Sequence, residues 1–213
     1  MKIAIIGAGN VGTSLGSGWL KSGHHIIYGV RNPSDEKAAK LKTSSSAVEA
    51  ASNADAARAA DVVVFSTPWA ATEASVRDCG SLSGKTVIDA TNPLKSDLHL
   101  DRGFTTSGAE QVAQWAKGAE VFKTMNQIGF GLMDHPVFQG DAKPVMFVAG
   151  DGAGKSKVVQ LVSDLGFEAI DLGGLEYARL LEPYALIWIH LSVFRNQGRD
   201  FAFSLLRQKN TPH

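Results

Sequence analysis

The stretch "KIAIIGAGNVG", residues Lys2 to Gly12, decides the fold. Its first half is a short apolar run, and its second half is a complete G-x-G-x-x-G motif. In nucleotide-binding proteins this order corresponds to a buried strand, a tight glycine turn and the start of a helix. A second apolar run, His24–Val30, follows after about one strand–helix–strand unit. The stretch therefore predicts a dinucleotide-binding βαβ unit at the N-terminus.

Each glycine of the motif has its own physical reason. The first permits the tight turn, the second lets a pyrophosphate approach the backbone, and the third lets the helix pack closely on the strand. The helix N-terminus then offers unpaired N–H groups and the positive end of its dipole to phosphate. The loop residues predicted to bind a dinucleotide are Gly7, Ala8, Gly9, Asn10, Val11 and Gly12. The alternative is a glycine turn that binds nothing.

Apolar runs alternate with helix-like segments along the rest of the chain. Strands are expected over Lys2–Gly7, His24–Val30, Asp61–Thr67, Thr86–Thr91, Glu120–Met125, Pro144–Gly150 and Glu168–Gly173, with a weaker one near Val48–Ala51. Helices are expected over Val11–Ser22, Ser34–Leu41, Asp55–Ala60, Trp69–Asp78, Ala109–Ala116 and Gly154–Leu165. Several apolar runs lack alternation, which is typical of parallel strands buried on both faces. The pattern predicts an α/β fold with a doubly wound, Rossmann-type parallel sheet.

The pattern changes after Gly173. Residues 174–208 contain no strand-like segment and one early breaker, Pro183, so we expect one long helix or two helices joined there. The chain thus divides into a dinucleotide-binding domain, residues 1–173, and a small C-terminal helical extension, residues 174–213, that covers a cleft. Apolar residues fall at helical spacings in the extension: Leu186, Ile189, Val193 and Phe194, then Leu191, Phe201 and Leu205. This surplus of apolar surface favours a homodimer, the alternative being that both helix faces pack within one chain.

Length and composition exclude several classes of protein. A chain of 213 residues suits one domain with a small appendage. Its formal net charge of zero gives no reason to expect a nucleic acid or an anionic membrane as a partner. The single cysteine, Cys79, rules out an intramolecular disulfide and suits a reducing compartment. With no signal-peptide pattern and no apolar stretch long enough for a bilayer, we expect a cytoplasmic protein.

The stretch "YGVRNPSD", which ends the second apolar run, bears on the choice of cofactor. An acid normally follows this strand and binds the ribose 2′-hydroxyl of NAD(H). Here the position holds Gly29, Val30 and Arg31, and the arginine is a permanently charged, bidentate phosphate ligand. Asn32 and Ser34 add polar groups, and Ser34 is the expected N-cap of the next helix. The stretch favours NADP(H) over NAD(H); the alternative is that Arg31 is a solvated surface residue.

Three other strand ends carry groups suited to a ligand, because ligands of an open parallel sheet bind beyond the carboxyl ends of its strands. The residues expected to face the cofactor there are Ser66, Thr67, Pro68 and Trp69, then Asn92 and Pro93, then Asn126 and Ile128. The alternative for each is ordinary turn chemistry, which favours Asn, Pro and Ser.

Other motifs exclude chemistry. The segment "AGDGAGKS" resembles a phosphate-binding P-loop, but Ala149 stands where the first glycine is needed, so we expect at most a weak anion site and no ATP hydrolysis. Histidines and the cysteine lack metal-ligand spacing, and His190 is expected to be an interior or interface residue. No general acid or base stands out, so we predict no catalytic side chain. Hydride transfer between two stacked ring systems needs positioning above all.

The segments "IAIIGAGNVG", "YGVRNP", "TPW" and "IDLGGLEYARLLEP" carry a resemblance to a known family. Over nearly its whole length the chain resembles the NADPH:F420 oxidoreductases, whose second substrate is the deazaflavin F420. The last segment is also similar to the cytosolic NADPH domain of six-transmembrane ferric reductases, which use a flavin. The resemblance implies cofactor binding by the glycine loop, Arg31 and Thr67–Trp69, ring stacking near Asn126–Gly129, and dimerisation through the C-terminal region. The chain departs from the family by reading Asn-Gln-Ile-Gly for His-Thr-Ile-Pro at that stacking position, and Val30 for a serine.

Two functions follow as expectations. The first is an NADP(H)-dependent oxidoreductase that exchanges hydride with F420 or with a flavin-like acceptor such as FMN or FAD. The second is an NADP(H)-binding redox sensor or regulatory module without turnover. A reductase needs an open, apolar slot the size of a ring system, and a sensor does not.

Overall fold

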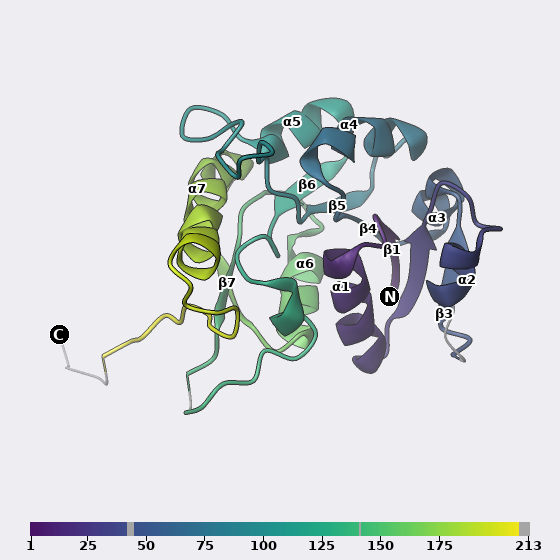
Figure 1. Ribbon diagram of the computed structural model, residues 1–213. Coiled ribbons are helices and arrows are strands. Elements are labelled where there is room, and N and C mark those ends of the chain that lie inside the picture. Colours follow the sequence, from purple (N-terminus) through teal and green to yellow (C-terminus); the bar gives the residue numbers. More distant parts are fainter. Residues whose placement is uncertain (42–44, 141, 209–213) are drawn as a thin grey trace.

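Six parallel strands form the centre of the computed structural model, which describes residues 1–41, 45–140 and 142–208 (Figure 1). The strands are β1 (Lys2–Ile6), β2 (His25–Gly29), β3 (Val48–Ala51), β4 (Val62–Phe65), β5 (Thr86–Asp89) and β6 (Glu120–Lys123). Their spatial order is β3-β2-β1-β4-β5-β6. Order and parallel pairing confirm the Rossmann-type sheet and the weaker strand near Val48.

The last two expected strands lie outside this sheet. β7 (Val145–Val148) and β8 (Glu168–Asp171) form a separate parallel pair. An antiparallel bridge between Lys123 and Ala149 links the pair to β6, with backbone N···O distances of 2.7 and 3.0 Å. The end of β7 therefore runs antiparallel to β6.

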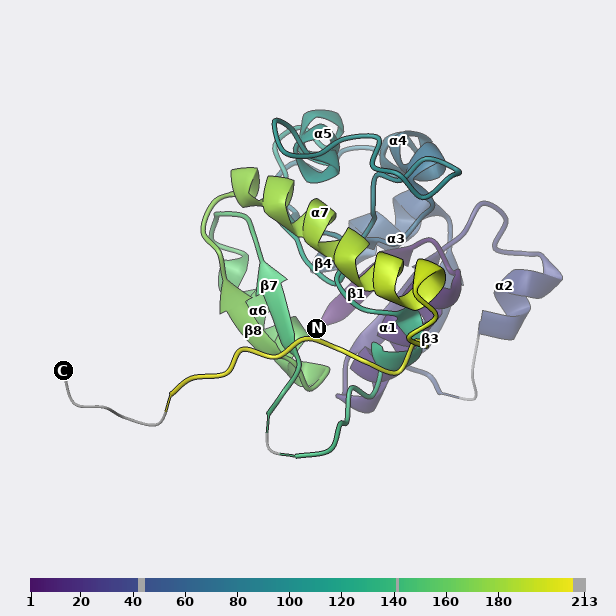
Figure 2. The same ribbon diagram turned by 60° about the vertical axis from the view of Figure 1, so that its left-hand side comes forward.

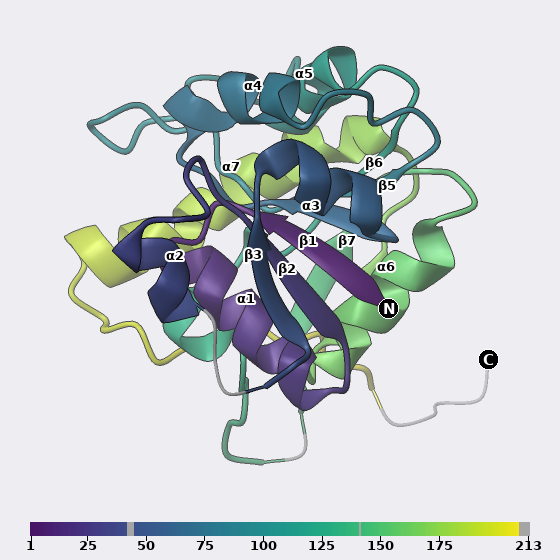
Figure 3. The same ribbon diagram turned by 90° about the vertical axis from the view of Figure 1, so that its right-hand side faces the viewer.

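Helices cover both faces of the sheet (Figure 3). On one face lie α1 (Asn10–Lys21) and α6 (Lys155–Asp164), and on the other lie α3 (Asn53–Ala59), α4 (Trp69–Asp78) and α5 (Gly108–Trp115). The short helix α2 (Glu36–Leu41) follows β2. Because the central strands are buried on both sides, their Val, Ile and Phe side chains pack into two separate hydrophobic cores, one on each face of the sheet. None of the helices in the described parts of the chain has the length and apolarity to cross a membrane.

The strand register brings four loops to one edge of the sheet. Ile6 lies opposite Phe65, Phe65 opposite Asp89, and Asp89 opposite Lys123. Each of these residues is the last of its strand, so the loops that follow β1, β4, β5 and β6 leave the sheet side by side. This carboxyl edge is where an open parallel sheet binds ligands.

The C-terminal extension differs from its expected form. After the 3₁₀ turn η2 (Leu175–Tyr177), α7 (Ala178–Ile189) runs through Pro183 and continues as the π-helical turn η3 (His190–Phe194). In Figure 2, α7 extends from beside the β7–β8 pair toward the end of the molecule where α1 begins. The expectation of helix as far as residue 208 is wrong, because residues 195–208 contain no helix.

Tertiary contacts hold the segment after the helix in an extended path. The Trp188 indole N–H donates to the Phe201 carbonyl at 2.9 Å, and the two rings stack with centroids 5.2 Å apart. The Val145 N–H donates to the Phe203 carbonyl at 2.9 Å, so the tail also lies against β7. Phe201 therefore packs within its own chain, and its apparent helical spacing does not reflect a helix face.

Candidate functional site

The glycine loop joins β1 to α1, and its glycines differ in what surrounds them. Gly7 has a φ of +105°, a conformation that favours glycine. A Cβ at Gly12 would lie 2.1 Å from the Gly7 carbonyl oxygen, so the close helix–strand approach requires glycine there. A Cβ at Gly9 would meet no protein atom within 4 Å, and its φ of −84° suits any residue. The fold therefore does not require glycine at position 9, and the open space beside its backbone suits a ligand.

The N-terminus of α1 is free to accept an anion. Gly9 is its N-cap and has no side chain to cap the helix. The first helical hydrogen bond runs from the Thr13 N–H to the Gly9 carbonyl at 2.9 Å, so the N–H groups of Asn10, Val11 and Gly12 precede it. Unpaired N–H groups and the positive end of the helix dipole together form a phosphate site. The residues present thus fit a dinucleotide pyrophosphate.

A protein carboxylate already fills the corresponding place at α6. Glu120 accepts hydrogen bonds from the Ala153 N–H at 3.0 Å and the Gly154 N–H at 2.7 Å. Lys155 is also engaged, because it forms ion pairs with Asp151 and Asp171. The weak anion site that the sequence allowed at "AGDGAGKS" is therefore occupied by a carboxylate of the chain itself.

The segment after β2 presents its polar groups to solvent. Arg31 is exposed, and none of the ion pairs in the described residues involves it. Asn32 Oδ1 accepts the Ser34 N–H at 3.1 Å and so shapes the turn. The cap of α2 is Asp35, whose Oδ1 accepts the Ala38 N–H at 2.7 Å. The expectation that Ser34 caps this helix is wrong by one residue, because the helix begins later than its sequence suggested.

The loop after β4 supports the glycine loop. The Ser66 hydroxyl donates to the Gly7 carbonyl at 2.8 Å, and the Thr67 and Thr72 hydroxyls share a hydrogen bond of 2.9 Å. Pro68 is the N-cap of α4 and provides no side-chain acceptor, so this helix start is also uncapped. Ser66 and Thr67 therefore hold the backbone in place with their side chains.

Trp69 points toward other protein side chains. Its indole N–H donates to Asp101 Oδ2 at 3.2 Å, and its ring centroid lies 5.5 Å from that of Trp115. The Arg102 guanidinium lies 6.0 Å from the same ring. Trp69 thus anchors the loop between β5 and α5.

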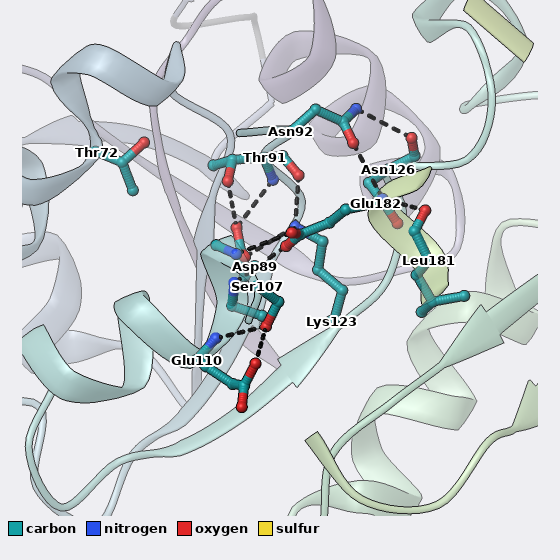
Figure 4. Close-up of polar contacts among 12 residues, drawn as sticks. Thr72, Asp89, Thr91, Asn92, Ser107, Glu110, Lys123, Asn126, Leu181 and Glu182 are labelled. Atoms are coloured by element: carbon teal, nitrogen blue, oxygen red, sulfur yellow. Dashed lines mark hydrogen bonds and ion pairs between the residues drawn. The ribbon is translucent and has the colours of Figure 1, made fainter. Parts of the chain in front are cut away.

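The loops after β5 and β6 are joined by an amide pair, Asn92 and Asn126 (Figure 4). The Asn92 Nδ2 group donates to the Asn126 backbone carbonyl at 3.1 Å, and the Asn126 Nδ2 group donates to Asn92 Oδ1 at 3.1 Å. Asn126 also donates to the Leu181 carbonyl of α7 at 3.2 Å. The residue between strand and pair, Met125, has a φ of +60°, which is rare for a side chain of this size.

Four predicted site residues turn inward. Ile128 is buried in the core, and Ala8 and Val11 pack against it. Pro93 is buried too, and a Cβ at Gly108 would lie 3.2 Å from its ring. Ile128 and Pro93 therefore present little side-chain surface to a ligand, whereas Ala8 and Val11 are half-buried.

A group of three charged side chains, which was not predicted from the sequence, lies beneath the amide pair (Figure 4). Lys123 ends β6 and is completely buried. Its Nζ lies 2.9 Å from Asp89 Oδ2 and 3.1 Å from Glu182 Oε1, and it donates to the Thr91 carbonyl at 2.6 Å (Figure 4). Burial lowers the pKa of Lys123, but the two carboxylates more than offset this, so the pKa lies above its usual value. We call Asp89, Lys123 and Glu182 the buried charge cluster.

The cluster also caps a helix. Glu182 Oε2 accepts the Gly108 N–H at 2.8 Å, and its Oε1 accepts the Ala109 N–H at 3.1 Å, at the start of α5. One signal was visible in the sequence: Asp89 and Lys123 interrupt apolar strands, and Glu182 interrupts an apolar helix. That the three meet depends on the strand register and on the path of α7.

An open cavity of about 340 Å³ lies between the β5–α5 loop and the end of α7. It is lined by Asp97, Leu98, His99, Leu186, Ile189, His190 and Phe194. His190 is exposed, with its ring 5.7 Å from that of Phe194, so the expectation of an interior histidine is wrong and an interface role stays a prediction. Four of the seven lining residues, Leu98, Leu186, Ile189 and Phe194, are apolar, so the size and lining of the cavity suit a ring system.

Cys79 is not a reactive group. Burial, with the nearby Asp78, raises the pKa of its thiol to about 12. Within the described residues, no group of three His, Cys, Asp or Glu side chains is arranged to hold a metal ion.

The Rossmann-type sheet and the uncapped start of α1 together define a dinucleotide-binding protein. The family model described as NADP oxidoreductase, coenzyme F420-dependent, matches residues 2–93. The F420-dependent NADP reductase of Methanothermobacter thermautotrophicus is 32% identical over 228 residues, covering 94% of this chain and 92% of that protein. The chain belongs to the family of F420-dependent NADP oxidoreductases.

Two further relatives differ in how much of their own length this chain matches. The crystal structure of a putative F420-dependent NADP-reductase from Arthrobacter sp. FB24 superposes with a TM-score of 0.85 at 31% identity, covering 97% of this chain and all of that one. The rat metalloreductase STEAP3 is 26% identical over 87% of this chain, which matches 36% of that protein. Both resemblances named in the sequence analysis are therefore confirmed.

Proposed function

We propose that this protein transfers hydride between NADP(H) and the deazaflavin F420. The observation that carries the proposal is the open cavity between the β5–α5 loop and α7. A redox sensor has no need of a second ring-sized opening, whereas a reductase must admit an acceptor. FMN or FAD could fill such an opening as well, and family membership favours F420 among these acceptors.

The proposed cofactor site follows the carboxyl edge of the sheet. The N–H groups at the start of α1 would hold the pyrophosphate beside Gly9, and Arg31 would bind the 2′-phosphate. The amide pair, Asn92 and Asn126, would border the nicotinamide. NADPH supplies the hydride when it is bound. We assign the remaining loop residues, Ser66 to Trp69, to shaping the site.

Positioning is the chemistry that the chain itself provides. Among the described residues near this edge, the charged side chains Asp89, Lys123 and Glu182 are fully buried and bonded to one another, so we assign none of them to proton transfer. Hydride transfer between ring systems needs contact distance, alignment and the exclusion of water. We propose that residues 174–208 exclude water by covering the edge.

The acceptor is tested by incubating the protein with NADPH and a panel of F420, FMN, FAD and a ferric chelate, and following NADPH oxidation. We expect F420 to be turned over with the highest kcat/KM. Ile189→Trp should fill the cavity and abolish turnover while leaving NADPH affinity intact. Leu206→Trp is the matched control, because Leu206 is a leucine that is 78% exposed and does not line the cavity.

The result that would overturn the proposal is tight NADPH binding with no turnover of any acceptor, which would favour the redox sensor. Preferential turnover of FMN or FAD would keep the reductase and replace F420. An Ile189→Trp variant that reduces F420 at the wild-type rate would place the acceptor elsewhere.

We further propose that the protein is a homodimer. On the extension, Leu180, Ile187, Val193 and Phe194 are apolar and between 43% and 58% exposed. Apolar groups at this density on one helix are typical of an association surface. A second copy of the chain would bury them. Light scattering on the wild-type protein tests this, and a monomer at micromolar concentration would contradict it.

A further inference from the structure

The segment "ARLLEP", which ends the stretch "IDLGGLEYARLLEP", connects α7 to the rest of the molecule through two charged side chains. Arg179 donates two hydrogen bonds to the Glu110 carboxylate, at 2.9 and 2.6 Å, and so contacts α5. Glu182 reaches the start of the same helix and the buried Lys123. The first contact is partly exposed, whereas the second is completely buried. The buried one therefore needs its own explanation.

The buried charge cluster is fully satisfied. The three donors of the Lys123 ammonium match three acceptors: Asp89 Oδ2, the Thr91 carbonyl and Glu182 Oε1. Asp89 Oδ1 accepts the Thr91 N–H at 3.0 Å and the Thr91 hydroxyl at 2.7 Å. Burying charges is unfavourable, and well-packed apolar groups often replace a buried ion pair without loss of stability. Stability alone is therefore a weak reason for this arrangement.

The buried charge cluster includes contacts directly beside the residues that hold Asn92 and Asn126 in place. Thr91 directly precedes Asn92, and Leu181, whose carbonyl accepts from Asn126, directly precedes Glu182. The buried lysine thus fixes the backbone next to each partner of the pair. One loop comes from β5 and the other contact comes from α7, so a single ammonium group sets the spacing between them (Figure 4).

We propose that Lys123 is a positioning residue for the nicotinamide end of the site. It holds the loop that carries Asn92 and the helix that meets Asn126, and it thereby sets how the nicotinamide lies against the acceptor. This inference rests on the proposed NADP(H) site. It adds a requirement that the adenosine end of the cofactor does not share, because the glycine loop follows β1 and Arg31 follows β2, away from the buried charge cluster in sequence.

The test compares two ligands, NADPH and 2′-phospho-ADP-ribose, which is the same molecule without the nicotinamide. Isothermal titration should show that Lys123→Met binds 2′-phospho-ADP-ribose as the wild type does but binds NADPH about tenfold more weakly. The hydride-transfer rate constant in single turnover should fall about a hundredfold, as expected for a small misplacement of reacting groups. Lys21→Met is the matched control, since it removes an exposed lysine that pairs with Asp134 and should change neither ligand.

A second variant protects the test against misfolding. Lys123→Met leaves two buried carboxylates without a counter-charge, whereas Glu182→Gln leaves one ammonium and one carboxylate and keeps an acceptor for the start of α5. We expect Glu182→Gln to be folded by circular dichroism and to weaken NADPH selectively. Equal weakening of both ligands, or of neither, in the folded variants would overturn the inference. If none of the acceptors in the panel were reduced, the proposed function would be wrong, but the comparison of the two binding affinities could still be made.

Discussion

The substitutions Gly9→Val and Gly12→Ala separate the two reasons for glycine in the loop. A side chain at Gly9 meets open space, so the fold should tolerate valine, and the free energy of unfolding should fall by no more than about 1 kcal/mol through the poorer N-cap. A methyl group at Gly12 would lie 2.1 Å from the Gly7 carbonyl oxygen and 2.7 Å from the Ser66 hydroxyl. Such overpacking should lower the free energy of unfolding by about 1–3 kcal/mol.

Binding should respond in a different way. Valine at position 9 would occupy the space through which phosphate reaches the N–H groups of α1, and each hydrogen bond to a charged group contributes about 1.5–3 kcal/mol. Loss of one such bond weakens NADPH binding about tenfold or more. Urea denaturation followed by circular dichroism measures stability, and isothermal titration measures affinity. The reasoning is refuted if Gly9→Val is folded and binds NADPH as tightly as the wild type.

Three further outcomes follow. Arg31→Ala should weaken NADPH binding by about 1.5–3 kcal/mol and NADH binding little, and equal losses in titration would contradict the 2′-phosphate assignment. The hydrogen bonds from Arg179 hold the pKa of Glu110 below its usual range, so their stabilisation is present at neutral pH and is lost as the pH falls through that lowered pKa. The stability difference between wild type and Glu110→Gln should accordingly shrink in acid, and urea denaturation at two pH values would show a constant difference if the contact were unimportant. Ile187→Asp places a charge on an exposed apolar face and should shift the mass in light scattering toward the monomer, whereas an unchanged dimer would exclude this face.

Local patterns were sufficient where a short stretch decides its own structure. The glycine spacing predicted the loop because each glycine answers a steric demand within a few residues, at Gly7 and Gly12. Mostly apolar runs predicted all eight strands, including the weaker one near Val48, and several of these runs lack alternation because the central parallel strands are buried on both faces. Helix boundaries were less certain, as the cap at Asp35 shows, since two neighbouring residues can both cap a helix.

Sequence patterns gave wrong predictions where contacts between distant segments determine the local structure. Phe201 falls at a helical spacing, yet its carbonyl and ring meet Trp188, and this contact outweighs local periodicity. Ser66 and Trp69 lie at a strand end as expected, but their side chains bond to the protein, which only the packing of neighbouring loops could show.

The sequence by itself determined the alternation of strands and helices and the glycine loop, because these depend on spacings within about one strand–helix unit. The resemblance to the family rested on whole segments spread along the chain. Only the tertiary structure decided that Asp89, Lys123 and Glu182 share one buried site, since they come from two strands and a helix that are far apart along the chain. The physical reason is that a charge can be buried only beside its partners, and those partners are set by strand register and by the path of α7.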